Sequence, residues 1–63
     1  MFTVKTVYHD YRTETTECYH ASENGQIMQN VYSFRSSRVQ AYCDARNAGS
    51  DHESAMQTAI ATR

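Results

Sequence analysis

The chain has 63 residues with a formal net charge of −1, and it contains no Leu, no Trp and no Pro. This length accommodates one small domain and excludes two. No uncharged run approaches the ~20 apolar residues of a membrane-spanning helix, and the first residues lack the apolar stretch of a signal peptide. Two cysteines are too few for a disulfide framework, so we expect reduced thiols, a cytoplasmic location and no membrane contact.

Residues 1–34 have the pattern of β-strands, because apolar and polar residues alternate along them. The segment 10–12 is expected to reverse the chain, so that a second strand covers residues 13–21. Asn24-Gly25 is the strongest hairpin signal in the chain and leads into a third strand over residues 27–34. We therefore expect an antiparallel meander of three strands.

A two-residue loop at Asn24-Gly25 sets an expected register for the second and third strands. Glu23 then faces Gln26, and an uninterrupted count outward pairs Ala21 with Met28. The expected core face carries the aromatic side chains, namely Tyr19, Ala21, Met28, Tyr32 and Phe34. The opposite face carries Cys18, His20, Ser22, Ile27, Gln29 and Val31.

After Phe34 the hydrophobic pattern has a helical period. Ser37 and Gln40 have the spacing of a capping box, which predicts a helix that ends near Gly49. A second capping box over residues 50–53 predicts a second helix that continues to the end of the chain. The sequence therefore predicts one α+β domain over residues 1–63, with the meander over 1–34 and a helical hairpin over 37–63, both helices lying against one sheet face.

The segment from Val31 to Cys43 combines a strand ending in Phe34, a serine cap and a short amphipathic helix. In this architecture and in size, over roughly residues 26–49, the chain resembles small accessory proteins of temperate tailed (lambdoid-type) phages and their prophage remnants. The resemblance implies a small cytoplasmic protein that modulates its host by binding a host or phage protein.

One possible metal site combines cysteine and histidine side chains from both halves of the chain. Cys18 and His20 project from one face of a strand, and Cys43 with His52 would complete a tetrahedral zinc site. Structural zinc sites usually show paired knuckles such as C-x2-C, whereas Cys43 and His52 are nine residues apart across a turn. We therefore expect no metal and no other cofactor, and a protein that folds in chelator.

Catalysis and nucleic-acid binding are both disfavoured by the sequence. His9 and Asp10 point to opposite strand faces, and no Gly-rich phosphate loop is present, so we expect no enzyme. Residues 1–34 carry a net charge of −2 and residues 35–63 carry +1, so neither half offers a basic patch for phosphates. A small nucleic-acid-binding regulator that uses the sheet or the 38–62 helical hairpin is the alternative function.

The expected function is that of a non-catalytic protein-binding module. Tyr8 and Tyr11, near the first turn, are candidate aromatic anchors, and Arg35 with Arg38 offers a contact for an acidic partner. The second sheet face, with Ile27 and Val31, is apolar enough for self-association.

A homodimer is expected because the core is thin for an independent domain. We expect the dimer to use the second sheet face, with Val7, Cys18, Ile27 and Val31, and we expect Ile27→Glu to give a monomer or an unfolded chain. Edge pairing of the first strand with its copy is the other possible dimer contact.

Overall fold

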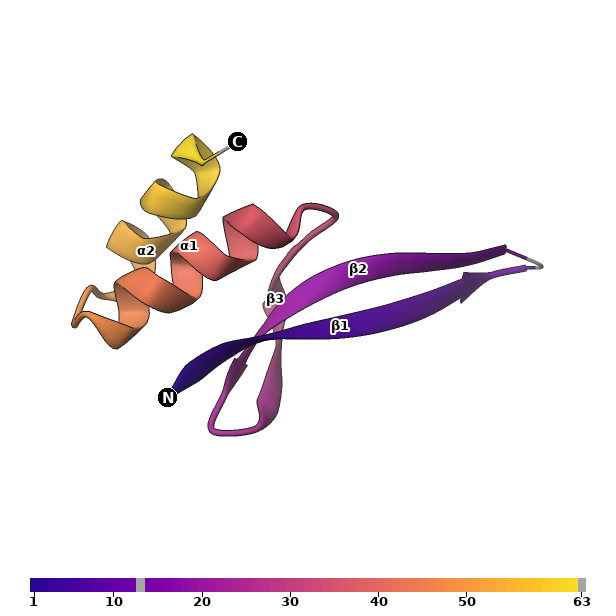
Figure 1. Ribbon diagram of the computed structural model, residues 1–63, viewed down its shortest axis with the longest axis horizontal. Coiled ribbons are helices and arrows are strands. Elements are labelled where there is room, and N and C mark those ends of the chain that lie inside the picture. The colour runs from indigo at the N-terminus through magenta and orange to yellow at the C-terminus, as the bar shows by residue number, and fades with distance from the viewer. Residues whose placement is uncertain (13, 63) are drawn as a thin grey trace.

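The computed structural model describes residues 1–12 and 14–62, with Tyr11 described by its backbone alone. Its elements follow the chain as β1 (Phe2–Tyr11), β2 (Glu14–Glu23), β3 (Gln26–Ser33), α1 (Ser36–Asn47) and α2 (His52–Ala61). The three strands form one antiparallel sheet in the order β1-β2-β3, and the helices lie to one side of it (Figure 1). The predicted α+β architecture is confirmed.

The Asn24-Gly25 turn has the backbone conformation that its sequence predicts. Asn24 (φ 51°) and Gly25 (φ 90°) both have positive φ, as a type I′ hairpin turn requires. Arg12 (φ 68°) also has positive φ, in the turn that joins β1 to β2. The predicted start of the second strand at Thr13 lies outside the described residues.

The register of β2 with β3 follows the prediction only next to the turn. Glu23 pairs with Gln26 and Ser22 with Ile27, but His20 then pairs with Tyr32. Four residues of β3 thus lie between two pairs that enclose only one residue of β2, and this bulge gives β3 three extra residues. Because three is an odd number, the side chains after the bulge lie on the opposite face from the one predicted.

The core lies between α1 and one face of the sheet, and α2 packs mainly on α1 (Figure 1). The prediction that both helices lie against the sheet is therefore wrong. The buried core residues are Ala21, Val31, Val39, Tyr42, Cys43, Ala55 and Ala59, with Phe2, Val4, Tyr19 and Met28 partly buried around them. Tyr32 and Phe34, predicted in the core, are exposed because the bulge turns them to the other face. No helix among residues 1–12 and 14–62 is long and apolar enough to span a bilayer.

Both helix boundaries shift slightly from their predicted capping boxes. Arg35 is the N-cap of α1 and makes no side-chain cap hydrogen bond. The side-chain amide of Gln40 donates to Asp44 Oδ1 at 2.8 Å instead of reaching back to the start of the helix. Asp51, not Ser50, caps α2, and its carboxylate accepts the Ser54 N–H at 2.8 Å. Gly49 (φ 105°) ends α1 as predicted, where the Gly49 and Ser50 amides donate to Arg46 and Ala45 in a Schellman motif.

We predict a pH-dependent contribution of Asp51 to stability. The hydrogen bond from the Ser54 amide lowers the pKa of the Asp51 carboxyl. The stabilisation is therefore present above the unfolded-state pKa of ~3.9 and is lost as the pH falls through the lower folded-state value. Thermal melts should show that Asp51→Ala lowers the midpoint more at pH 6 than at pH 3. Asp51→Asn keeps an acceptor, so its loss should be smaller at each pH, with the same difference between pH 6 and pH 3 because neither variant has the titrating carboxyl. Equal losses for Asp51→Ala at both pH values would contradict the prediction.

Candidate functional site

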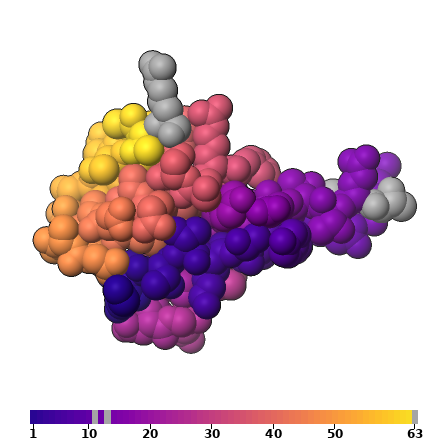
Figure 2. Space-filling model, in the orientation of Figure 1, coloured from indigo at the N-terminus to yellow at the C-terminus, as the bar shows by residue number. Residues whose placement is uncertain are grey.

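The outer halves of β1 and β2 form an arm that projects from the helix-covered body. Pairing of β2 with β3 ends at Tyr19, whereas β1 and β2 remain paired to Tyr11 and Glu14. The molecule is 40 Å long and 14 Å thick, and the arm accounts for its elongated shape in Figures 1 and 2. An isolated two-stranded hairpin is marginally stable in water, so an arm of this kind gains stability from anything that covers it.

Backbone groups at the outer edge of β1 can be assigned from one contact with α1. Asn47 Oδ1 accepts the Phe2 N–H at 2.8 Å, and Asn47 Nδ2 donates to the Phe2 carbonyl at 2.9 Å. Phe2 therefore directs both backbone groups away from β2. Because the direction alternates along a strand, the backbone groups of Val4, Thr6 and Tyr8 also point to the outer edge.

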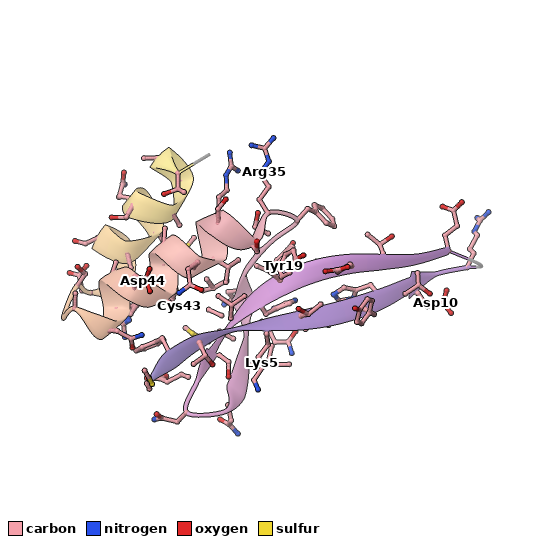
Figure 3. The ribbon with its side chains drawn as sticks, in the orientation of Figure 1. Lys5, Asp10, Tyr19, Arg35, Cys43 and Asp44 are labelled. Atoms are coloured by element: carbon pink, nitrogen blue, oxygen red, sulfur yellow. The ribbon has the colours of Figure 1, made fainter. Side chains whose placement is uncertain are left out.

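The arm carries more acidic than basic groups. Arg12 provides one positive charge, and the carboxylates of Asp10, Glu14 and Glu17 provide three negative charges, which gives a net charge of −2. Lys5 lies outside the arm, because it pairs with His20 where β2 also pairs with β3. Asp10 lies near the tip in Figure 3. Tyr8 is 65% exposed and pairs with Glu17 on the same face of the sheet. The arm thus presents an exposed aromatic ring beside carboxylates.

The structure separates the predicted protein-binding residues. Tyr8 on the arm and Ile27 after the second turn are exposed, and Arg35 is exposed at the start of α1. The half-buried Arg38 donates from Nε to the Thr62 carbonyl at 2.9 Å, so its guanidinium joins the two helices. The side chain of the predicted anchor Tyr11 lies outside the described part of the chain.

Val31 does not lie on the predicted open face. It is 4% exposed and belongs to the core, because the bulge in β3 turns it toward α1. Cys18 is also buried and Val7 is half-buried. Of the four residues expected at a dimer interface, Ile27 is the exposed one. The bulge adds the exposed Tyr32 and Phe34 to the same face, so self-association there stays a prediction.

The four side chains considered as a zinc site in the sequence, and disfavoured there by their spacing, do not come together. Cys43 lies on α1 where the helix faces the sheet (Figure 3), and burial raises the pKa of its thiol. His52 Nδ1 is hydrogen-bonded to the Tyr42 hydroxyl at 2.9 Å. Cys18 and His20 lie on the opposite sheet face, so the combination of these two residues with Cys43 and His52 is wrong.

A different cluster forms around Cys18 and His20. Potential ligand atoms of His9, Cys18 and His20 all lie within 4.8 Å of one another. His9 on β1 pairs with Thr16 of β2, which places it on the face that carries Cys18 and His20. His9 was not grouped with these two residues from the sequence, because the sequence fixes no register for the first hairpin. The pairing of Tyr11 with Glu14 at the turn would have supplied that register.

A hydrogen bond at Nδ1 and stacking against Tyr32 hold the His20 ring in one orientation. Nδ1 lies 3.1 Å from the Met28 carbonyl oxygen, and since a carbonyl only accepts, the proton is on Nδ1 and the Nε2 of the neutral ring carries a lone pair. Tyr32 stacks on the ring at 5.2 Å with an interplanar angle of 22°. His20 is 4% exposed and Cys18 is 2% exposed.

The cluster opens into a small cavity at the base of the arm. This cavity has a volume of about 170 Å³ and is lined by His9, Cys18, His20, Gln29, Tyr32 and Phe34. Tyr32 and Phe34 are largely exposed, whereas the thiol and the His20 ring are buried, so the two aromatic rings form the outer wall. A separate groove of about 110 Å³ lies between β3 and the two helices.

No protein-family model, curated protein or solved structure matches the chain.

We predict that Tyr32 controls access to Cys18. Tyr32→Ala should speed alkylation of Cys18 by about tenfold or more, because the wall over the cavity is removed while opening of the fold itself is little changed. Cys43, on the other side of the sheet, is an internal control whose alkylation should keep its rate. Peptide mapping by mass spectrometry gives both rates from one sample. Tyr8→Ala is the matched variant, and it should change neither rate; equal acceleration at both cysteines would indicate general unfolding instead.

Proposed function

We propose that the protein is a non-catalytic, cytoplasmic protein-binding module that engages its partner through the arm. The observation that carries this proposal is the outer edge of β1, which pairs with no other strand among the described residues and continues onto a projecting two-stranded arm. Exposed edges of this kind are templates for an added strand. Binding would complete the hydrogen bonds of the edge and support an arm that is marginal alone.

The chemistry of the arm favours one kind of partner, an extended segment with basic side chains. Main-chain hydrogen bonds to Val4, Thr6 and Tyr8 would supply affinity, and Tyr8 would serve as the aromatic anchor. Asp10 and Glu17 share a face with Tyr8, so basic side chains on the partner would meet opposite charge. Pairing of two arms from copies of this chain would instead bring carboxylates together.

Other properties of the chain are consistent with this proposal. Cys18 and Cys43 are both free and lie on opposite sheet faces, as suits a reducing compartment. The resemblance to phage accessory proteins implies a host or phage protein as the partner, and this stays a prediction. Nucleic acid is the alternative ligand, but an arm with a net negative charge lacks the attraction for phosphates that such binding requires.

The test removes one outward amide from the edge of β1. Thr6→Pro deletes the N–H that a partner strand would use, and proline is tolerated on edge strands where the N–H faces solvent. We expect partner binding to weaken at least about tenfold, which corresponds to ~1.4 kcal/mol. Thr6→Val keeps the amide and is the matched control that should bind normally. Circular dichroism checks that both variants remain folded.

The partner can be identified by a photo-crosslinking residue placed at Tyr8 in the cell that makes the protein. We expect an adduct with one protein, joined through a basic extended segment, that disappears in Thr6→Pro and persists in Thr6→Val. A probe at the exposed Thr58 on α2 is the positional control. The same adducts from both probes, adducts with nucleic acid, or adducts only between copies of this chain would each overturn the proposed partner, the last in favour of the homodimer.

A further inference from the structure

We propose that His9, Cys18 and His20 bind one transition-metal ion of the zinc class, with a fourth position open to the cavity at the base of the arm. The inference is independent of the proposed protein partner. It also replaces the expectation of no metal, which was based on the spacing of a different set of residues.

The distances between the three side chains suit a tetrahedral ion. With Zn–N bonds of ~2.0–2.1 Å and a Zn–S bond of ~2.3 Å, the ligand atoms of a bound zinc lie ~3.3–3.6 Å apart. The atoms here lie within 4.8 Å of one another. Small side-chain rotations bring them to bonding distance, and no change of strand register is needed because all three residues already share one sheet face.

The hydrogen bond of His20 is a second observation that points to a ligand. Metal-binding histidines usually donate their other ring N–H to a carbonyl or carboxylate, which fixes the tautomer and the ring orientation. His20 makes this bond from Nδ1 to the Met28 carbonyl. Its Nε2 lone pair is therefore available for an ion, while stacking on Tyr32 limits rotation of the ring.

The donor types select the class of ion. One thiolate and two imidazoles are borderline to soft ligands that favour Zn²⁺ and its neighbours over Mg²⁺ and Ca²⁺, which require oxygen donors. The described ligands number three, and the 170 Å³ cavity beside them has room for a water molecule or another small ligand in the fourth position.

The ion would join the two strands of the arm at the arm's base. His9 lies on β1, whereas Cys18 and His20 lie on β2, so binding cross-links the strands next to the point where β3 ends. The helix-covered core contains none of the three ligands. We therefore expect the body to stay folded in chelator, and the amides of the arm to exchange faster than in the zinc-bound protein.

The test uses full-length reduced protein, stripped of metal by chelator, and Co²⁺ and Zn²⁺ as probes. We expect one Co²⁺ per chain, a thiolate-to-cobalt charge-transfer band and the visible bands of tetrahedral cobalt, with Zn²⁺ displacing it. At a free zinc concentration of about 100 times Kd, the unfolding midpoint should rise by roughly 10–20 °C.

Ligand variants make the assignment residue by residue. His9→Gln and Cys18→Ser should each weaken binding by more than about 100-fold, beyond what loss of a supporting hydrogen bond costs, and Cys18→Ser should also abolish the charge-transfer band. His9 is only half-buried, so His9→Gln tests the site even if Cys18→Ser fails to fold. His52→Gln is the matched histidine control and Cys43→Ala the matched cysteine control, and both should bind as the parent chain does.

Three outcomes would overturn the proposal. They are uptake of well below one ion per chain, a cobalt spectrum with no thiolate band, or unchanged affinity in a folded His9→Gln variant. None of these results bears on the edge of β1, so they leave the proposed protein-binding function intact.

Discussion

The bulge in β3 is the constraint on which the rest of the structure depends. Between the pairs Ser22–Ile27 and His20–Tyr32, β2 contains one residue and β3 contains four, so the side chains of β3 change faces partway along the strand. Met28 and Val31 can therefore both face α1 although they are three residues apart. The same change carries the Tyr32 ring to the other face, where it stacks on His20.

The packing of α1 explains why the bulge is favourable. Tyr42 on α1 is fully buried, with its hydroxyl hydrogen-bonded to His52, and Val31 is buried in the same cluster. Val31 brings no polar atom that needs a partner there, whereas a tyrosine in its place would have to bury a second hydroxyl. The bulge thus matches a small apolar side chain to the core, and it also places the Met28 carbonyl against the His20 ring.

Local patterns in the sequence predicted the elements, and long-range packing decided what they could not. The alternation of apolar and polar residues, the turn sequence Asn24-Gly25 and the helix-ending Gly49 are signals that act over only a few residues. The three strands, the type I′ turn and the end of α1 were therefore predictable. The bulge reflects competition between Val31 and Tyr32 for space under a helix that comes later in the chain. The set of zinc ligands considered from the sequence lacked His9 for a related reason: grouping Cys18 and His20 with His9 requires the register of the first hairpin.

Alternation along β1 gives the arm two chemically separate surfaces on one strand. Thr6 and Tyr8 send their backbone groups to the outer edge, while the side chain of His9 lies on the face with Cys18 and His20. A partner strand and a metal ion would therefore use different atoms, and neither would block the other. Both would order the arm, which is only marginally stable alone. Binding of either one would therefore reduce the conformational-entropy cost of binding the other. Thermodynamic reciprocity then requires that zinc tighten partner binding by the same factor by which the partner tightens zinc binding.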